Sequence, residues 1–437
     1  MRRLYPATPS PRLSTEGVLA MADRNETIFA TLRDGRTSSW IRPHVSGADR
    51  LGQVISGTDV DAAIARFERF APILRELFAD GGWDGRVASE LIAFAAPESE
   101  SWWVKGDHAL PMTGSIKARG GVHELLCIVE TIALTKGLAL DMLLTPEARA
   151  ILGGHRVVVA STGNLGYSIG VVGRAFGLKT EIHMSADAKM WKKDRLRDIG
   201  ADVVEHACDY SETIARARAA AAGRHDTTFV DDEGSRHLLT GYAAAADELA
   251  CQLEARGIRV NAETPLVVYL PCGVGGAPGG ITYGLKRRFG ASVATVFVEP
   301  VASPCVMVAL ASGGVLPPSV YQYGCDNDTI ADGLAVPRAS SLVLDAVGEA
   351  IDAVVAVTDS AMLDWVRKAW HQSALRLEPS AAAAFAAHAP FCLAAASEPE
   401  WPRLDKATHL FWATGGSKVP EPEFAALLSP DLADAQI

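Results

Sequence analysis

Lys117 is the residue of this sequence best suited to covalent chemistry. It lies in the segment PMTGSIKARGG at 111–121, between a Gly-Ser turn and the start of a predicted helix. A lysine held in this way can lay its stem along apolar Ile116 and point its amine into a cleft. Partial burial lowers the pKa of a lysine and makes its amine a nucleophile toward an aldehyde. A lone lysine at a helix start is more often solvated, so this interpretation depends on the other segments.

A polar turn, STGNLG at 161–166, directly follows the β-branched run RVVVA and opens a helical pattern. Backbone N–H groups at a helix start bind anions, and the polar side chains of the turn add to them. We expect Ser161, Thr162 and Gly163 to hold a substrate carboxylate, and Asn164 to hydrogen-bond a phenolic oxygen. The same residue types also form ordinary helix caps, so this turn alone leaves both interpretations open.

Glycines dominate the segment GVGGAPGG at 273–280, which follows the apolar run LVVYLPC. Such a backbone can curl so that several N–H groups converge on a phosphate. The segment lacks the Gly-Lys-Ser/Thr of a P-loop and has no convincing dinucleotide fingerprint. We therefore predict a phosphate site formed by Gly273, Val274, Gly275, Gly276 and Ala277.

A fourth segment, ATGG at 413–416, places Thr414 after the last apolar run, HLFW. There its hydroxyl can meet the nitrogen of an aromatic heterocycle. A lysine, an anion-binding turn, a glycine loop for phosphate and such a threonine are the parts that a pyridoxal 5'-phosphate (PLP) site requires. The four segments together predict this cofactor, with Lys117 as the Schiff-base lysine.

Alternating strands and helices must position these segments. Ligands of parallel sheets bind at the carboxyl ends of strands, and the polar segments follow predicted strands. Helical patterns separate the predicted strands, which is typical of a mostly parallel sheet covered on both faces. The predicted strands are 156–160, 179–185, 201–206, 227–232, 266–271, 294–300, 353–357 and 409–412. Further helices are predicted at 59–79 and 380–396, and a flexible tail at 1–30, where Met21 is an alternative start to Met1.

Composition excludes several classes of function. The 41 Lys and Arg against 52 Asp and Glu give a net charge of −11, which provides no electrostatic reason to bind nucleic acid. No stretch approaches ~20 consecutive apolar residues and no signal-peptide core is present, so we expect a cytoplasmic protein without membrane contact. The 7 cysteines are odd in number and contain no CxxC pair. We therefore expect neither a disulfide framework nor a metal site.

The segments together resemble the bacterial D-serine ammonia-lyase (D-serine dehydratase) family of fold-type II PLP enzymes. GSIKARGG at 114–121 is similar to the PLP-lysine motif, and STGNLG at 161–166 and YLPCGVGGAPGG at 269–280 fit as well. Other fitting segments are MSADAKMWKKDRLRDIGADVVE at 184–205, DGLAVPRAS at 332–340, RLEPSA at 376–381 and HLFWATGG at 409–416. The resemblance runs in the family's order from about Arg66 to the C-terminal region.

The resemblance implies an α/β fold like that of tryptophan synthase β, with two open, twisted, mostly parallel sheets flanked by helices. A small domain would span 155–235, and a large PLP-binding domain would consist of 31–154 and 236–437. Lys117 would carry the cofactor, Asn164 would face its phenolic oxygen and Thr414 its ring nitrogen. Thr162 would act near the reacting carbon.

The resemblance also suggests residues that contact the substrate and a site for a monovalent cation. Asp232 or Glu233 would line the substrate side, with Asp232 as a candidate catalytic group. A monovalent cation, K⁺ or Na⁺, activates some relatives, and Glu299 is a candidate ligand for it. This chain has Ala277 where a third consecutive glycine is common, and an alanine fits there if its φ is negative. It also has Ser417-Lys418 where apolar residues are usual, which could alter the floor of the pocket.

The implied reaction is the elimination of water from D-serine, a small amino-acid substrate, to give pyruvate and ammonia. A monomer is favoured over a homodimer. The motifs leave open a PLP dehydratase of L-serine, threonine or D-threonine, and a non-catalytic PLP-binding paralogue. The lack of a Walker lysine argues against a nucleotide-binding protein. His108 and His123 are interpreted as satisfied or solvated side chains rather than catalytic ones.

Overall fold

The computed structural model describes residues 15–79, 82–95, 97, 100–161, 163–186, 188–207, 210–314, 316–402 and 404–429, with side chains from residue 24 onward except those of 210 and 211. The strands are β1 (Ser38–Ile41), β2 (Leu91–Phe94), β3 (Ser101–Lys105), β4 (Arg156–Ala160), β5 (Lys179–Ser185), β6 (Asp202–His206), β7 (Thr227–Val230), β8 (Leu266–Pro271), β9 (Val293–Pro300), β10 (Ala353–Val357) and β11 (Thr408–Trp412). The helices from the N-terminal half are α1 (Thr15–Arg33), α2 (Gly57–Leu77), α3 (Lys117–Lys136), α4 (Pro146–Leu152), α5 (Asn164–Phe176), α6 (Met190–Asp198) and α7 (Tyr210–Ala221). Those that follow are α8 (Arg236–Ala243), α9 (Ala245–Ala255), α10 (Gly276–Phe289), α11 (Cys305–Ser312), α12 (Ser341–Val347), α13 (Asp359–Ser373), α14 (Pro379–Ala386), α15 (His388–Ala395) and α16 (Glu421–Leu428).

The larger sheet has the strand order β1-β10-β9-β8-β11-β3-β2. Its inner pairings are parallel, whereas the edge strands β1 and β2 run antiparallel to their neighbours. Every residue of β8, β9, β10 and β11 is buried, because helices cover both faces of the sheet. The apolar, β-branched runs of the sequence are therefore the central strands.

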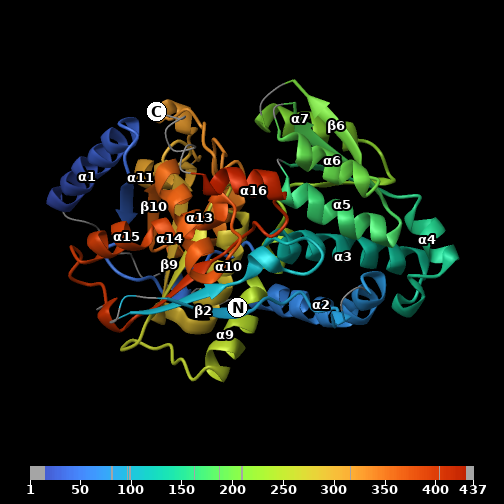
Figure 1. Ribbon diagram of the computed structural model, residues 1–437, viewed down its shortest axis with the longest axis horizontal. Coiled ribbons are helices and arrows are strands. Elements are labelled where there is room, and N and C mark those ends of the chain that lie inside the picture. The colour runs from blue at the N-terminus through green and yellow to red at the C-terminus, as the bar shows by residue number, and fades with distance from the viewer. Residues whose placement is uncertain are drawn as a thin grey trace, which may run out of the picture.

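The smaller sheet has the order β6-β5-β4-β7, and all of its pairings are parallel. Its strands lie within residues 156–230. In Figure 1 the helices α5, α6 and α7 lie around it in green, on the side of the molecule away from the yellow and orange elements of the larger sheet. Helix α3 contacts α5 of the smaller sheet and α8 of the larger one. The expected α/β architecture with two mostly parallel sheets is confirmed.

Two segments differ from their sequence-based description. The predicted tail at 1–30 is helical from Thr15 onward, and α1 packs on the core through the buried Ile28 and Phe29. The predicted helix at 380–396 is two helices, α14 and α15, with the break at Ala387. Pro390 explains the break, because its ring lacks an N–H group and would clash with the carbonyl four residues earlier in a continuous helix.

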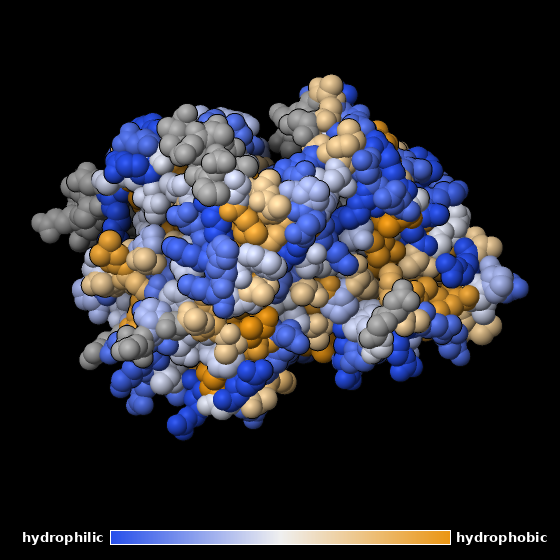
Figure 2. Space-filling model, viewed as in Figure 1, coloured by the Kyte–Doolittle hydropathy of each residue, from blue (hydrophilic) through white to orange (hydrophobic). Residues whose placement is uncertain are grey.

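On the face in Figure 2, hydrophobic residues lie in small groups among hydrophilic ones. None of the helices in the described part of the chain is both long and apolar enough to cross a membrane.

Candidate active site

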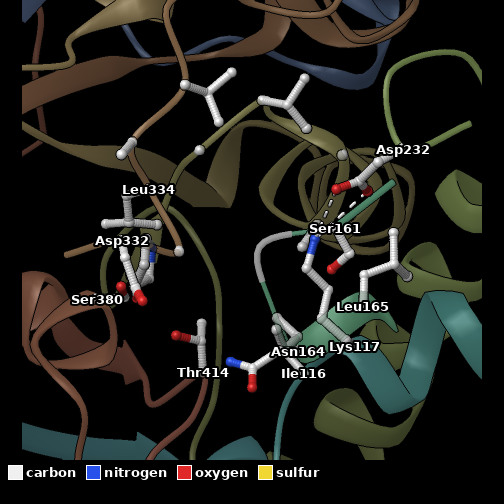
Figure 3. Close-up of a pocket in the computed structure, with 18 of the residues that line it drawn as sticks. Ile116, Lys117, Ser161, Asn164, Leu165, Asp232, Asp332, Leu334, Ser380 and Thr414 are labelled. Carbon is white, nitrogen blue, oxygen red and sulfur yellow. Dashed lines mark hydrogen bonds and ion pairs between the residues drawn. The ribbon is translucent and has the colours of Figure 1, made fainter. Parts of the chain in front are cut away.

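One cleft collects the residues that follow the carboxyl ends of strands in both sheets. With its open mouth included, the cleft spans about 820 Å³ of space outside protein atoms. Figure 3 shows Lys117 reaching toward Asp232, with Thr414 and Asn164 nearby and Asp332 across the opening. The lining residues named from the sequence are Lys117, Ser161, Asn164, Asp232, Gly273, Val274, Gly275, Gly276, Ala277 and Thr414.

Lys117 is held in the cleft by a backbone connection to the end of β11. The N–H group of Ile116 donates to the carbonyl of Thr414 at 2.7 Å, and Ser115 forms an antiparallel bridge with Gly415. Lys117 is the first residue of α3, so its backbone is fixed on both sides. The lysine and the threonine, which are far apart in sequence, are therefore positioned by the same contact.

The electrostatic surroundings of Lys117 correct the sequence-based expectation. Burial has the largest single effect and lowers the pKa of this amine, as expected, but Asp232 and Tyr242 together outweigh it and the pKa lies above its ordinary value. The Nζ atom lies 3.4 Å from Oδ2 of Asp232 and 5.8 Å from the ring centre of Tyr242. The amine must therefore give up a proton before it can act as a nucleophile, and Asp232 is the nearest acceptor.

The glycine loop after β8 forms an anion cradle. Gly275 has φ +106°, a conformation that favours glycine. Within the part of the chain that the structure describes, the backbone N–H groups of residues 273–277 donate to no protein acceptor. Five such groups at the start of the 14-residue helix α10 suit a phosphate. Ala277 is not among the non-glycine residues with positive φ, so its methyl group is accommodated as expected.

The 161–166 turn is organised by Ser161. Its Oγ atom accepts hydrogen bonds from the N–H groups of Gly163 at 3.0 Å and Gly166 at 2.9 Å. Ser161 therefore fixes the entry into α5, and among the described residues no group accepts the hydrogen of its hydroxyl. Thr162 lies outside the described residues. Gly163 is the N-cap residue of α5 and is not part of the cleft lining.

A partly buried carboxyl group in the cleft, that of Glu378, was not identified from the sequence. The amide of Asn164 donates to Oε1 of Glu378 at 2.8 Å. Burial raises the pKa of Glu378 above its ordinary range. A Cβ at Gly415 would lie 2.3 Å from Oε1 of Glu378, so only glycine leaves room for this carboxyl group. RLEPSA was recognised as a family-like segment, but nothing in it indicated a contact with Asn164.

An ion pair crosses the opening of the cleft. Lys192 of α6 donates to Oδ2 of Asp332 at 2.5 Å, and both residues line the cleft. Lys192 belongs to the side of the smaller sheet, whereas Asp332 lies in the segment between α11 and α12. Both fall in segments that resemble the family, yet their pairing depends on the tertiary fold and could not be predicted.

A buried ionic network supports the floor of the site. Asp107 accepts two hydrogen bonds from Arg119, at 2.7 and 2.8 Å, and one from Trp412 Nε1 at 2.7 Å. Arg119 is two residues after Lys117, and Trp412 is two residues before Thr414. The network thus fixes the two elements that present the lysine and the threonine.

The remaining candidates lie outside the cleft. His123 is buried between Arg66 and the carbonyl of His237, and burial lowers its pKa to about 3. His108 is also buried and does not line the cleft. The interpretation of both histidines as non-catalytic therefore agrees with their positions. Of the two acidic residues left open, Asp232 lines the cleft and Glu233 does not.

The structure also places the candidate cation ligand and the Ser417-Lys418 pair. Glu299, the candidate cation ligand, is fully buried, and its oxygens accept hydrogen bonds from the N–H groups of Val306 and Met307. Burial raises the pKa of Glu299 to about 7. Ser417 and Lys418 do not form the floor of the pocket but pack close to Gly114, where a Cβ would meet them at 2.5 and 2.6 Å.

The residues present fit PLP. The free N–H groups of 273–277 suit its phosphate, and Lys117 is a buried amine within reach of the same cleft. Thr414 contributes a hydroxyl that can pair with a ring nitrogen, and Asn164 contributes an amide for a phenolic oxygen.

Comparisons with known proteins identify the family of the chain. Residues 90–400 match the family model of the pyridoxal-phosphate dependent enzymes. The chain is 47% identical over 416 residues to a probable D-serine dehydratase of Burkholderia thailandensis, covering 91% of this chain and 93% of that protein. It is 44% identical over 421 residues to a probable D-serine dehydratase of Pseudomonas paraeruginosa, covering 90% and 93%.

Solved structures share the fold. The diaminopropionate ammonia lyase of Escherichia coli in complex with D-serine matches with a TM-score of 0.67 at 17% identity, covering 90% of this chain and 97% of that chain. A fungal L-serine ammonia-lyase of Rhizomucor miehei matches with a TM-score of 0.58 at 20% identity, covering 78% and 97%. At these identities the likeness shows the fold alone.

Proposed function

Because the chain belongs to the pyridoxal-phosphate dependent enzyme family, we propose that it is a D-serine ammonia-lyase, which removes water from D-serine and yields pyruvate and ammonia. The observation that carries the proposal is the convergence of the Lys117 amine, the free N–H groups of 273–277 and Thr414 in one cleft. The choice of D-serine is supported by the relatives of 44% and 47% identity.

The residues that would hold the cofactor follow from the chemistry of its parts. Lys117 would attach its aldehyde carbon, and the 273–277 loop would bind its phosphate. Thr414 would face the ring nitrogen, while Asn164, oriented by Glu378, would face the phenolic oxygen. When bound, PLP supplies an electron-withdrawing ring that weakens the Cα–H bond of an attached amino acid.

The chain's own groups then bind the substrate and move its protons. The hydroxyl of Ser161 and the start of α5 would bind the carboxylate, because N–H groups at a helix start favour an anion. Lys117 Nζ and Asp232, 3.4 Å apart, can pass a proton between them. Such a pair can accept a proton from carbon and return it to a leaving oxygen, which typically contributes ~10²–10⁴-fold to a rate. Thr162 stays a proposed catalytic group near the reacting carbon.

We also propose two domains, a cellular location and an oligomeric state for the chain. Residues 155–235 would form a small domain, and 31–154 with 236–437 a large one, so that closure across the cleft would assemble the site. The protein would act as a cytoplasmic monomer, since one chain supplies Lys117, the 273–277 loop and Thr414 together.

We also propose a monovalent cation as an activator of the enzyme. Light scattering of the purified protein tests the monomer, and activity in K⁺ against a large organic cation tests the activator.

The test of the function is pyruvate release from D-serine and, separately, from L-serine, with added PLP and K⁺. We expect a strong preference for D-serine. Lys117→Ala should lose both turnover and the absorption band of covalently attached cofactor, whereas Lys136→Ala, at the exposed end of the same helix, should retain both. Preference for L-serine would overturn the substrate assignment, and pyruvate from neither would leave a PLP-binding protein with another role.

A further inference from the structure

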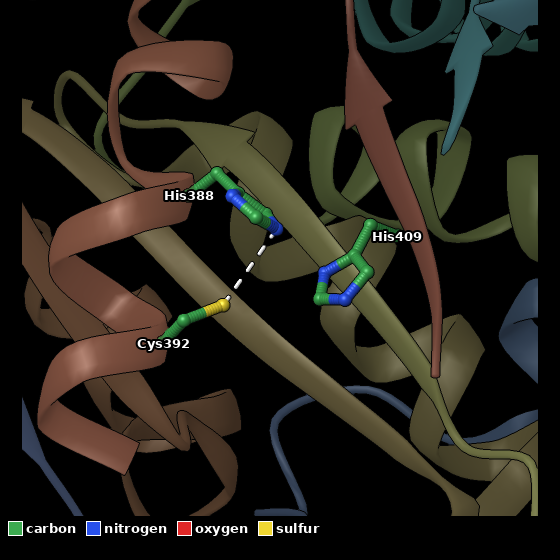
Figure 4. Close-up of side chains that lie close together, drawn as sticks. All are labelled: His388, Cys392 and His409. Carbon is green, nitrogen blue, oxygen red and sulfur yellow. Dashed lines mark hydrogen bonds between the residues drawn. The ribbon is translucent and has the colours of Figure 1, made fainter. Parts of the chain in front are cut away.

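A second cluster of reactive side chains lies apart from the cleft. His388 and Cys392 on α15 and His409 on β11 each offer one ligand atom, and these atoms lie within 4.8 Å of one another. In Figure 4 the three side chains point from the helix and the strand into one common space. Cys392 Sγ is 3.6 Å from Nε2 of His388. None of the three lines the cleft, so the cluster has no part in the function proposed above.

The spacing of these residues suits a metal ion. His388 and Cys392 are four residues apart on one helix, which places them on the same face. Zinc binds cysteine sulfur at ~2.3 Å and histidine nitrogen at ~2.0 Å, so tetrahedral ligands lie roughly 3.3–3.7 Å apart. The pair on α15 already has this separation. His409 needs a shift of about 1 Å, which side-chain rotation can supply.

The hydrogen bonds of His409 orient its ring and leave Nδ1 as the nitrogen for a metal, where zinc would replace the hydroxyl of Tyr269. The ring of His409 donates to the backbone of Leu404, and its Nδ1 atom lies 2.9 Å from the hydroxyl of Tyr269. A second bond of this kind, from a ring nitrogen to a carbonyl, is the usual way in which proteins orient a metal-binding histidine.

A fourth oxygen donor stands next to the cluster. Oε2 of Glu100 lies 3.1 Å from Nε2 of His388 and accepts a hydrogen bond from Trp102. Carboxylate oxygens bind zinc at ~2.0–2.2 Å and can complete a tetrahedral set with nitrogen and sulfur.

We propose that His388, Cys392 and His409 bind one Zn²⁺ ion per chain, and that the Glu100 carboxylate exchanges its contact with His388 for the fourth position. The site ties α15 to β11, the strand that leads to Thr414, and we assign it a structural role because protein ligands would then fill all four positions. No CxxC pair signals it in the sequence. Its signal is the His-x-x-x-Cys spacing at 388–392, and the third ligand becomes evident only from the fold.

Zinc binding by this set must release a proton. An ordinary thiol has a pKa of about 8.5, so it is mostly protonated near pH 7.5 before the ion arrives. The sulfur binds as a thiolate, and its proton passes to solvent. An ordinary imidazole, with a pKa of about 6.5, is mostly neutral at that pH, so we expect about one proton released per zinc bound.

The experiment is a titration of the PLP-loaded, chelator-treated protein with ZnCl₂, followed by calorimetry and by proton release in weak buffer. We expect one zinc per chain. Cys392→Ser and His388→Gln should each weaken zinc affinity by at least about 100-fold. Loss of a residue that only hydrogen-bonds a metal ligand already lowers metal affinity by ~10–100-fold. Cys251→Ser removes an exposed thiol outside the cluster and should leave zinc binding unchanged.

Tyr269→Phe separates a metal site from a hydrogen-bonded cluster. It removes the hydroxyl bonded to His409 but none of the proposed ligands, so zinc binding should persist. Thermal melting of each zinc-free variant checks that it folds. The proposal is overturned if the folded wild type takes up no zinc, or if Cys392→Ser binds it with unchanged affinity and proton release. Neither outcome bears on D-serine turnover.

Discussion

The amine of Lys117 lies 3.4 Å from Oδ2 of Asp232, and these two residues come from the start of α3 and the segment after β7. Both side chains are largely buried, with 20% and 12% of their surface exposed. Because burial lowers the pKa of Lys117 while Asp232, and after it Tyr242, raises it, the nucleophilicity of this amine depends on these partners as well as on burial.

Asp232→Asn is expected to lower the pKa of Lys117, because burial then acts without the opposing carboxylate. The cofactor-free variant should take up PLP at lower pH than the wild type does, as followed by absorbance across a pH series. Turnover should nevertheless fall by ~10²–10⁴-fold, since the proton acceptor is lost.

Glu233→Gln is the matched control for this prediction. Glu233 is adjacent in sequence but does not line the cleft, so both the pH series and turnover should stay near those of the wild type. If PLP uptake by Asp232→Asn had the same pH dependence as in the wild type, the carboxylate of Asp232 would not control the pKa of Lys117.

Gly275→Ala is expected to weaken PLP binding. The position has φ +106°, and an added Cβ would lie 3.1 Å from Cγ1 of Val343, so the loop must shift away from its anion-binding shape. The strain should cost about 1–3 kcal/mol of stability. Fluorescence titration with PLP and thermal melting measure the two effects.

Gly290→Ala distinguishes backbone strain from damage to the cradle. Gly290 also has positive φ, +57°, but no atom lies within 4 Å of an added Cβ and the residue is outside the cleft. This variant should lose stability and retain PLP affinity. Equal PLP affinities in the two variants would remove the 273–277 loop as the phosphate site.

Lys192→Met is expected to raise KM for the amino acid by about tenfold with a smaller effect on kcat, a change of ~1.4 kcal/mol in binding. The ion pair of Lys192 with Asp332 holds the two sides of the cleft together and places a positive charge beside the 161–166 turn. Steady-state kinetics of pyruvate release provide the measurement.

Lys193→Met is the adjacent control. Lys193 is buried as well, but it pairs with Glu205 at 2.7 Å and does not line the cleft. Its loss should affect stability and leave KM unchanged. A KM shift of similar size in both variants would point to a general loosening of α6 instead of a role for the ion pair.

The site could be located from the sequence because its parts follow strands of two parallel sheets. Thr414, Ser161 and the 273–277 loop lie just beyond the carboxyl ends of β11, β4 and β8, and such ends meet on one side of a sheet. The local pattern of an apolar run followed by glycines or small polar residues therefore predicted both the fold and the chemical parts. Pro390, which breaks the last predicted helix, was also visible in the sequence.

Contacts between distant segments could not be predicted in the same way. Asn164 and Glu378 are 214 residues apart, and Lys117 and Asp232 are 115 apart. No local pattern specifies such pairs, because they depend on how helices pack over two separate sheets. For this reason the direction of the Lys117 pKa was predicted wrongly although the residue itself lies where it was expected.

Asp107→Ala is expected to destabilise the fold by about 3–5 kcal/mol, because it leaves the buried guanidinium of Arg119 without its main partner. Burial raises the pKa of Asp107, but Arg119 outweighs it, so the folded-state pKa lies below the ordinary value. The stabilisation is therefore present above the unfolded-state pKa of about 3.9 and is lost as the pH falls through the folded-state value. Urea unfolding of wild type and variant at several pH values measures it.

The difference between wild type and Asp107→Ala should be largest near neutral pH and should shrink below pH about 4. Asp61→Ala, which removes an exposed pair with Arg287, should cost at most about 1 kcal/mol. Because Asp107 also binds Trp412, two residues before Thr414, its loss should weaken PLP retention even where the fold persists. If Asp107→Ala cost no more than Asp61→Ala and retained PLP fully, the network would not be what aligns Lys117 with Thr414.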